Sequence, residues 1–305
     1  MRLSTVFFDE STMNHSGIII LNKPEGETSR QTLNRLKRLA KPAKVGHAGT
    51  LDPIAKGVLL ACVGKATRLI DAIHLLPKHY IATFRLGWNS DTEDVTGNLT
   101  AVENPKIPNL ADIEKTIPLF TGRIEQRPPM FSALKVNGKR AYDLARKGQT
   151  VELKSRKIDV FEIKMLQYEY PKLVLGVLCG SGTYIRSLGR DIAEHIGTKS
   201  VMEELVRDFI GPFRLVNAIM PDFFVPENIE NWKNYLLPME QAVEHLPQMQ
   251  VDEQIAQKIL HGLKITVQDA FFHEKTIAVL NSEQKLISLL EPSEGNVFKP
   301  KVNFS

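Results

Sequence analysis

The chain of 305 residues contains 43% hydrophobic and 24% charged residues, a composition typical of a globular protein with one large domain and an appendage, or with two domains. No apolar run approaches the roughly 20 residues that cross a bilayer, and the first apolar run is too short for a signal peptide, which excludes the membrane-spanning class. Cys62 and Cys179 both lie in apolar runs, which predicts two reduced, buried thiols in a cytoplasmic protein.

The net charge of +4 is mild, but the basic residues are unevenly distributed. Between Arg123 and Lys157 there are ten basic and three acidic residues, and a second basic cluster extends from Arg30 to Lys44. Beyond Pro221 the balance turns acidic. This asymmetry favours a polyanion bound against the first two-thirds of the chain, although a solvated helix face explains any single cluster equally well.

The first two predicted elements are a strand and a helix. Residues 17–22 form a short apolar run that is typical of a buried strand. After a turn at residues 23–26, Thr28 or Ser29 can cap a helix whose apolar face carries Leu33, Leu36 and Leu39.

A glycine-rich stretch over residues 45–58 comes next, and it brings a histidine, a threonine and an aspartate into one turn. Asp is a favoured helix N-cap and Pro is favoured at the first helical position. Asp52-Pro53 is therefore predicted to start a helix through Ala55, Leu59 and Leu60 that ends near Gly64.

The central part of the chain alternates between strands and helices. Alternating side chains predict a strand over residues 80–86, followed by a polar loop over 87–97 and a helix over 109–121. Two prolines predict a basic loop over residues 127–133, before a short helix over 141–147. Strands over 158–165 and 172–179 precede a helix carrying Ile185, Leu188, Ile192 and Ile196 on one face.

The last part of the chain is predicted to be a small β-rich appendage after a boundary near Leu246-Pro247, with a helix over residues 254–260 and a strand over 276–280. The order of elements has no βαβ rhythm. An α+β fold is therefore expected, with a mixed or mainly antiparallel sheet and packed helices.

Several familiar motifs are absent from the sequence. The glycines before Lys65 are spaced too widely for a phosphate-binding loop, and Gly180-Ser181-Gly182 lacks the spacing of a nucleophile elbow. The eight histidines are scattered, which predicts no metal site, and His74 and His79 are expected at the surface.

Five stretches in order resemble the bacterial tRNA pseudouridine synthase B family, which converts a T-loop uridine (U55) of tRNA to pseudouridine. They are Lys23-Pro24-x-Gly26-x-Thr28-Ser29, residues 46–53 continued by Ala55, Gly57 and Val58, Arg127-Pro128-Pro129 with Ser132-Ala133, Lys135 and Gly138, Ser181–Arg186, and a last block with Val201, Leu205, Arg207, Gly211 and Phe213. The resemblance covers residues 17 to about 213, which is most of the chain.

The resemblance implies the pseudouridine synthase fold over residues 17–245, with a mixed, mainly antiparallel sheet and flanking helices, and a small domain similar to the PUA RNA-binding module over 246–305. Residues 1–16 have no counterpart and are treated as an extension. The reaction involves no redox step and no phosphoryl transfer, so neither a cofactor nor a metal is expected. The expected partner is the T-arm stem-loop of tRNA, without a membrane, and a monomer is the default.

By the same resemblance, Asp52 is the nucleophile, Arg186 is the cation that pairs with it, and Tyr80 stacks on the target base. Leu205, treated as a helical residue, lines the uracil pocket, and His47 occupies the space that the flipped base leaves. Without the resemblance, Asp52 would be a helix cap, Arg186 a surface arginine, and Tyr80 a core tyrosine.

The resemblance also implies RNA contacts. Basic positions near the site would bind phosphates, and a central loop would hold the RNA backbone; these residues are Lys23 and Arg68 near the site and Arg127, Lys135, Lys139 and Arg140 in the loop. The sequence departs from the family pattern at Phe131, where tyrosine is common, and at Val206, where a second arginine often precedes Arg207 on what is taken to be a helix.

Two other functions remain open at this point. One is an RNA-binding or tRNA-folding protein whose catalysis is secondary, although Asp52, Tyr80 and Arg186 together argue against binding alone. The other is a pseudouridine synthase for a different structured RNA, because RNA is recognised largely by shape and by splayed bases.

Overall fold

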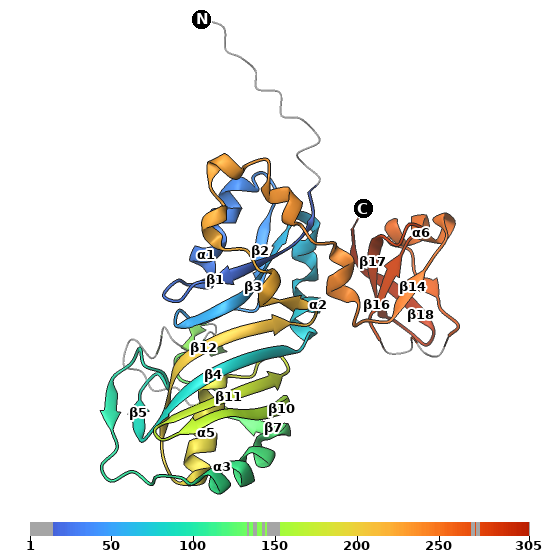
Figure 1. Cartoon of the computed structure of the whole chain (residues 1–305). Helices are drawn as coiled ribbons and strands as arrows, with labels where there is room; N and C mark the ends of the chain where they lie inside the picture. Colours follow the sequence, from blue (N-terminus) through green and yellow to red (C-terminus); the bar gives the residue numbers. More distant parts are fainter. Residues whose placement is uncertain are drawn as a thin grey trace, which may run out of the picture.

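The computed structural model describes residues 15–132, 134–136, 139–141, 144, 153–269, 272 and 275–304 (Figure 1). Within them, the main sheet has nine strands, seven of which follow the order β1, β3, β12, β4, β11, β10 and β7. Their bounds are Gly17–Lys23, Ala55–Val63, Ser200–Ile210, Lys78–Leu86, Lys172–Cys179, Arg156–Glu169 and Gly122–Gln126. β2 (Val45–Ala48) pairs with β3, and β13 (Phe213–Arg214) pairs with β12. Among the described strand pairs of this sheet, only β3 and β12 run in parallel, which confirms the predicted mixed, mainly antiparallel sheet.

Residues 55–63 form the strand β3, so the prediction of a helix starting at Asp52-Pro53 is wrong. The side chains of β3 alternate between two cores, with Val58, Leu60 and Cys62 in one hydrophobic cluster and Leu59, Ala61 and Val63 in another. A strand that is buried on both faces has a continuous apolar run, and periodicity does not distinguish such a run from a buried helix. The neighbouring strands β1 and β12 pair with both edges of β3 and make it a strand.

Residues 200–210 also form a strand, β12, and not the helix inferred for Leu205 and Arg207. The pairing of β12 with β4 has two register shifts, between Met202 and Glu204 and between Arg207 and Phe209. Such irregularities add a residue to one strand and move the following side chains to the other face. Met202 and Leu205 therefore enter the same core although they are three residues apart, a spacing that is also typical of a helix.

The helices largely match the predictions. α1 (Ser29–Leu39) begins at a Thr28–Gln31 capping box, and α5 (Ile185–Ile196) ends at Gly197 with φ +88°. α3 (Leu110–Thr116) is capped by Asn109 and continues as a 3-10 turn to Phe120. α2 (Ile70–Leu75) follows a 3-10 turn at Gly64–Leu69. No helix in the described part of the chain is long and apolar enough to cross a bilayer.

The predicted strands over 80–86, 158–165 and 172–179 are confirmed as β4, β10 and β11. β5 (Trp88–Ser90) takes up the start of the polar loop predicted over 87–97 and pairs with β6 (Leu99–Ala101) just beyond it, so the connecting loop spans residues 91–98. Residues 127–132 have no regular structure, and β8 (Lys135–Val136) and β9 (Lys139–Arg140) form a hairpin beyond them. The helix predicted over 141–147 lies mostly outside the described residues.

The carboxy-terminal part forms a second, five-stranded sheet in the described residues, in the order β14, β16, β17, β18 and β15. These strands are Gln248–Gln250, Ile277–Leu280, Leu286–Pro292, Val297–Asn303 and Ile265–Thr266, and α6 (Glu253–Leu260) packs with them. Figure 1 shows this sheet beside α2. The β-rich end of the fold is thus confirmed, and the domain boundary near Leu246-Pro247 stays a prediction.

Both cysteines are free and buried, as predicted. Burial raises the pKa of the Cys62 thiol to about 12 and that of Cys179 to about 11, so both are protonated at neutral pH.

Candidate active site

The loop between β2 and β3 carries Asp52, and residues of the first motif, over 23–29, hold this loop in place. The Ser29 hydroxyl accepts a hydrogen bond from the N–H of Leu51 at 2.9 Å and donates to its carbonyl at 3.1 Å. The N–H of Gly26 donates to the Pro53 carbonyl at 2.8 Å. The Asp52 carbonyl accepts from Ala55 at 3.0 Å, so the backbone at Asp52 closes a turn and its carboxylate does not cap a helix.

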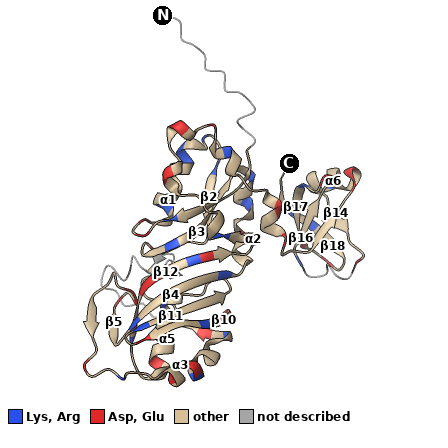
Figure 2. Cartoon of the chain, viewed as in Figure 1, with Lys and Arg blue, Asp and Glu red and all other residues tan. Residues whose placement is uncertain are grey.

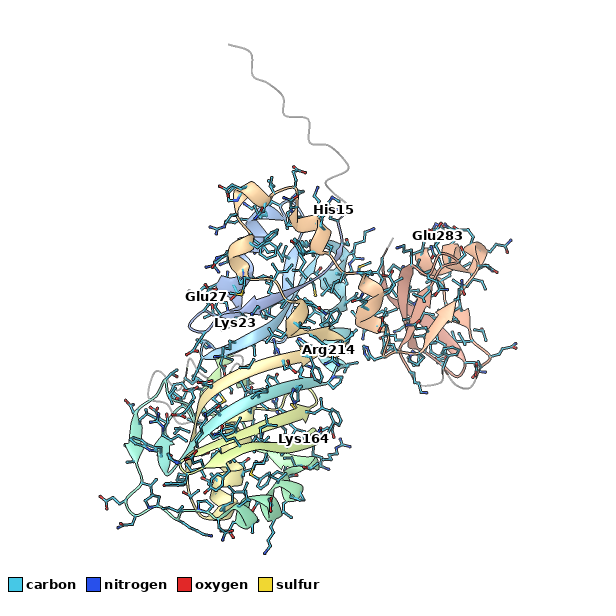
Figure 3. The ribbon with its side chains drawn as sticks, in the orientation of Figure 1. His15, Lys23, Glu27, Lys164, Arg214 and Glu283 are labelled. Atoms are coloured by element: carbon cyan, nitrogen blue, oxygen red, sulfur yellow. The ribbon has the colours of Figure 1, made fainter. Side chains whose placement is uncertain are left out.

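Lys23, which is labelled in Figure 3 on β1, stabilises the same loop with its side chain. Its side chain is fully buried, and its Nζ donates to the carbonyls of Pro24, Pro53 and Ala55 at 2.9, 3.2 and 2.5 Å. Burial lowers the pKa of Lys23 to about 8. The predicted phosphate contact is wrong for Lys23 in this structure, because the ammonium has no exposed surface and is directed at three carbonyls.

Arg186, in the first turn of α5, forms an ion pair with Asp52. The distance from Arg186 Nη2 to Asp52 Oδ2 is 2.9 Å. The Arg186 side chain is 5% exposed, which excludes a surface arginine, whereas the Asp52 side chain is 39% exposed. The cation is thus fixed inside the protein, and the carboxylate stays accessible beside the pocket.

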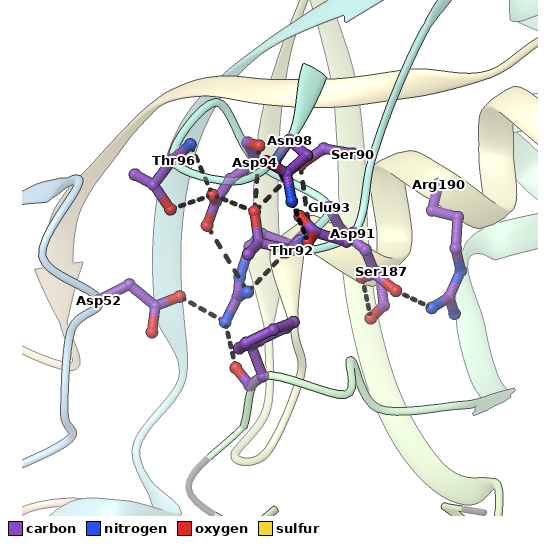
Figure 4. A network of polar contacts seen from close by, with 12 residues as sticks. Asp52, Ser90, Asp91, Thr92, Glu93, Asp94, Thr96, Asn98, Ser187 and Arg190 are labelled. Carbon is purple, nitrogen blue, oxygen red and sulfur yellow. Dashed lines mark hydrogen bonds and ion pairs between the residues drawn. The ribbon is translucent and has the colours of Figure 1, made fainter. Parts of the chain in front are cut away.

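The remaining contacts of Arg186 hold its guanidinium in one orientation (Figure 4). Nη1 donates to the Thr92 carbonyl at 2.7 Å and lies 3.6 Å from Asp94 Oδ2, and Nη2 also donates to the Phe131 carbonyl at 3.0 Å. Two loops, residues 91–98 and 127–132, therefore meet at Arg186. A planar guanidinium with several fixed partners has little freedom to reorient.

Asp94 is a buried carboxylate that sequence reasoning missed. It accepts hydrogen bonds from the Thr92 hydroxyl at 2.7 Å and from the N–H and hydroxyl of Thr96 at 2.9 and 2.6 Å. The Asp-Thr-x-Asp-x-Thr spacing around it is typical of a self-bonded polar turn, and this was the available signal. A buried charge requires such partners, so the loop is built around Asp94.

Arg207 crosses the base of the loop that carries Asp52. It is 1% exposed, its Nε donates to the Val58 carbonyl at 2.7 Å, and its Nη2 donates to the Gly49 carbonyl at 2.8 Å. Its guanidinium carbon lies 6.0 Å from the centre of the Tyr80 ring. The helical position expected for Arg207 is wrong, and the strand β12 directs this side chain inward.

A pocket of about 640 Å³ opens beside the ion pair. Asp52, Tyr80, Arg186 and Leu205 all line it, so the structure brings together four of the predicted site residues. Burial raises the pKa of the Tyr80 phenol, with nearby Arg207 opposing the shift, so the ring is neutral at physiological pH. The pocket combines an accessible carboxylate with an aromatic face and an apolar wall.

Sequence reasoning also missed His74 and Lys78, which line the same pocket. The N–H of Gly49 donates to His74 Nε2 at 3.2 Å, so His74 is half-buried at the site and not a surface residue. Lys78 Nζ donates to the carbonyls of His74 and Leu76 at 2.9 and 2.6 Å and to the Ser181 hydroxyl at 3.2 Å. Burial, with Arg207 adding to it, lowers the pKa of Lys78 to about 8. Its position two residues before Tyr80 was the only local signal.

Among the other predicted site residues, His47, Arg68 and Arg127 are not in the described lining of this pocket. His47 is in β2, half-buried, and its Nδ1 has no hydrogen-bond partner in the described structure. Arg68 donates to the Asn303 carbonyl at 2.6 Å and thus contacts the second sheet. Arg127 is exposed at the end of β7. The backbones of Lys135, Lys139 and Arg140 form the β8–β9 hairpin, and the predicted roles of their side chains stay predictions.

The pocket and one helix near it are rich in cations. In the described lining of the pocket, Asp52 is the one carboxylate beside four cationic side chains, those of Arg156, Arg186, Arg207 and Lys78, a balance that favours an anionic ligand. The helix α1 adds four basic side chains and no acidic one (Figure 2). Among the described residues, no group of three His, Cys, Asp or Glu side chains is placed to hold a metal ion.

The sequence of the chain is similar to those of known proteins over most of its length. The sequence pattern described as "TruB family pseudouridylate synthase (N terminal domain)" matches residues 37–185. The tRNA pseudouridine synthase B of Clostridium kluyveri is 41% identical over 261 residues, which cover 86% of this chain and 88% of that protein. The protein of the same name from Geobacillus thermodenitrificans is 35% identical over 296 residues and covers 93% and 98% of the two chains.

Among solved structures, the chain is similar to one titled "Crystal Structure of a Cbf5-Nop10-Gar1 Complex", with a TM-score of 0.75 and 26% identity over 97% of this chain and 87% of that one. A second structure, titled "Crystal structure of the archaeal box H/ACA sRNP Nop10-Cbf5 complex", has a TM-score of 0.72 at 24% identity, and the match covers 98% of this chain and 89% of that one. This second similarity shows the fold alone.

Proposed function

Because the chain belongs to the TruB family of pseudouridylate synthases, we propose that it is a tRNA pseudouridine synthase that isomerises the T-loop uridine (U55) of tRNA. The observation that carries this proposal is the Asp52–Arg186 ion pair, which opens on a pocket that Tyr80 and Leu205 also line. The names of the relatives support tRNA as the substrate, and the resemblance of the five motifs supports the T-loop as the modified part of it. The geometry of the site supports the proposed chemistry.

The reaction is an isomerisation in which atoms and electrons balance within one nucleotide. The bond from the ribose carbon to N1 of uracil breaks, a bond from the same carbon to C5 forms, and the proton of C5 leaves while N1 gains one. Such a rearrangement needs a nucleophile that holds the intermediate and a site that lets the base turn. The pocket volume of about 640 Å³ leaves room for a base and its ribose.

Asp52 is the proposed nucleophile. Its carboxylate is the accessible member of the ion pair, and Arg186 keeps the negative charge next to the reacting nucleotide. The ion pair also positions the carboxylate, because Arg186 is held by the carbonyls of Thr92 and Phe131. A fixed nucleophile avoids reorganisation during the reaction.

Tyr80 and Leu205 are the proposed walls of the base site. The Tyr80 phenol is protonated at neutral pH and offers a ring face for stacking, and Leu205 offers an apolar contact. A uridine within a folded loop must leave its stack before it can enter this pocket. We assign to His47, which precedes the Asp52 loop on β2, the space that the flipped base leaves.

The proposed RNA contacts outside the pocket are basic residues of the loop after β7 and of the β8–β9 hairpin: Arg127, Lys135, Lys139 and Arg140. Such contacts set affinity and orientation, since phosphates carry no sequence information. We further propose that residues 246–305 act as a small PUA-like domain and that the enzyme works as a monomer.

The test replaces Asp52 with Asn and follows pseudouridine in a T-arm stem-loop RNA. Activity should fall at least about 1,000-fold while RNA binding stays within about three-fold, because the charge of the nucleophile is lost and the pocket keeps its shape. Asp222→Asn is the matched control, since Asp222 is 82% exposed and its only described ion pair is with Arg35. Full activity of Asp52→Asn would refute the assignment.

A second experiment tests the substrate. Replacing U55 by cytidine in the same stem-loop should abolish product, and mapping pseudouridine in total RNA with and without the protein should show one tRNA position. Product at another structured RNA would retain the chemistry and overturn the substrate.

A further inference from the structure

Arg190 lies one turn after Arg186 on the same face of α5 and has contacts of the same kind. Its side chain is 12% exposed. Its Nε donates to Asp191 Oδ1 at 2.8 Å, its Nη1 pairs with Glu93 Oε1, and its Nη2 donates to the Arg127 carbonyl at 2.9 Å. The guanidinium thus satisfies three partners in three directions, none of which lines the pocket.

Two of these contacts make Arg190 the counterpart of Arg186 at the other end of one loop. Arg190 holds the carbonyl of Arg127, where the loop leaves β7, and Arg186 holds the carbonyl of Phe131, where the loop reaches the pocket. Just before the loop, at the end of β7, the Gln126 side chain accepts a hydrogen bond from the N–H of Tyr184 at 2.9 Å and donates one to its carbonyl at 3.0 Å. The loop is therefore attached near both of its ends to α5 or to the residue before α5.

Glu93 fixes Arg190 from the opposite side (Figure 4). Its other carboxylate oxygen accepts from the Ser187 hydroxyl at 2.8 Å, and its side chain is 14% exposed. Its backbone carbonyl accepts from Met202 in β12 at 3.0 Å. Glu93 has φ +63°, a left-handed conformation that is unfavourable for a side chain and requires such surrounding contacts.

We propose that Arg190 and Glu93 form a positioning pair that holds the start of the loop over residues 127–132 in place and thereby sets the affinity for RNA. In the sequence this loop precedes the basic strands β8 and β9, so we expect a shift at Arg127 to move the backbone that carries Lys135, Lys139 and Arg140. The pair acts through the loop backbone and touches neither substrate nor Asp52. The inference rests on the proposed function for its substrate, an RNA stem-loop.

The decisive variants are Arg190→Gln and Arg190→Lys. Arg190→Gln removes the positive charge and the planar guanidinium. Arg190→Lys keeps the charge, but one ammonium cannot bond to Asp191, Glu93 and the Arg127 carbonyl together. Lys199→Gln is the matched control, because it removes one positive charge just after α5 from an exposed pair with Glu194 at 2.7 Å. Glu93→Gln, made in the wild type and in Arg190→Gln, completes a double-mutant cycle.

Kinetics on the T-arm RNA should show KM raised about ten-fold in both Arg190 variants, with kcat changed less than about three-fold. Lys199→Gln should change KM less than about two-fold. Adding Glu93→Gln to Arg190→Gln should add little, since the pair acts as a unit. An unchanged KM in Arg190→Gln overturns the proposal, and an equal rise in Lys199→Gln assigns the effect to net charge instead.

Amide hydrogen exchange of the wild-type and variant proteins without RNA separates this inference from the proposed function. Peptides covering residues 127–132 should exchange faster in Arg190→Gln than in the wild type or in Lys199→Gln. If the wild type makes no pseudouridine, the proposed function fails, and the exchange result still decides the role of Arg190. Unchanged exchange in Arg190→Gln refutes the positioning role even in an active enzyme.

Discussion

Arg186 shares its guanidinium between two carboxylates that differ in exposure. The side chain of Asp52 is 39% exposed and that of Asp94 is 5% exposed. The buried carboxylate accepts three hydrogen bonds of its own, which fix it beside the arginine independently of the accessible one. We propose that each carboxylate has a separate task, one in the reaction and one in holding the arginine.

We expect Asp94→Asn to lower kcat about 10- to 100-fold, with KM changed less than about three-fold. The substitution disturbs the turn that holds Arg186, so the proposed nucleophile Asp52 should be misplaced while the proposed RNA contacts persist. Single-turnover kinetics on the T-arm RNA measure the effect. Asp91→Asn, at an exposed aspartate of the same loop, is the control, and an equal loss in both variants would contradict the prediction.

The hydrogen bond from the Gly49 N–H to His74 predicts acid sensitivity. Burial, with Lys78 adding to it and Asp71 opposing it, lowers the pKa of His74 below its ordinary value of about 6.5. Since the unfolded chain then binds the proton more readily, His74 lowers stability progressively as the pH falls below about 6.5. Protonation also turns Nε2 from an acceptor into a donor facing another donor.

The measurement is the free energy of unfolding of the wild type and of His74→Gln between pH 5 and pH 8. A glutamine amide oxygen can accept the Gly49 hydrogen bond at any pH, so the acid loss should be smaller in the variant. The ratio of the kcat of the wild type to that of His74→Gln should fall over the same pH range. If the unfolding free energies of both proteins decrease in parallel as the pH falls, His74 makes no contribution to the loss of stability in acid.

At the scale of elements, the close approach of β3 to β12 depends on Gly57. A Cβ built at Gly57 would lie 2.3 Å from the backbone carbonyl oxygen of Arg207, its partner in the parallel ladder. The residue has φ +104°, which alone disfavours any other side chain. The parallel strand pair at the base of the Asp52 loop therefore requires glycine for two independent reasons.

A pair of alanine substitutions separates these two reasons. Gly122 has φ +97°, and a Cβ at this residue would meet nothing within 4 Å, so Gly122→Ala should cost only the backbone term, about 1–2 kcal/mol of unfolding free energy. Gly57→Ala should cost at least about 2 kcal/mol more, because it forces two strands apart. Denaturant titrations compare them, and equal losses would exclude the steric contribution.

At the scale of the whole molecule, the second sheet is attached to the rest of the chain by apolar packing. One hydrophobic cluster contains Leu69 and Ile73 from the first part together with Leu280, Leu289 and Phe304 from the last. Polar contacts add to it, such as the exposed bond from Arg68 to the Asn303 carbonyl. Burial of apolar surface is the larger of the two effects by magnitude.

We expect Phe304→Ala to lower the unfolding free energy by about 3–5 kcal/mol, because its side chain is 5% exposed in that cluster. Arg68→Gln should lower it by only about 0.5–1.5 kcal/mol, the net contribution of one hydrogen bond. Scanning calorimetry of both variants tests the comparison. A loss in Arg68→Gln as large as that in Phe304→Ala would reverse the ranking of the two interactions.

Much of the fold was predictable because it depends on neighbours in the sequence. The Thr28 cap of α1, the apolar face of α5 and its stop at Gly197, and the alternation along β4 are local features that the structure confirms. At the site, Asp52, Arg186 and Leu205 were found through the five ordered motifs and Tyr80 through the same family resemblance, and the structure places all four around one pocket.

The sequence by itself determined the features that depend on local chemistry. These are the helix caps, the strands with alternating side chains, and the motif residues of the pocket. Only the tertiary structure decided that residues 55–63 and 200–210 are strands, because burial on both faces and shifts of register hide the period that distinguishes a strand from a helix. It also decided that Lys23 is buried, that Asp94 holds Arg186, and that Arg190 holds a loop, because burial and ion pairing depend on segments distant in sequence.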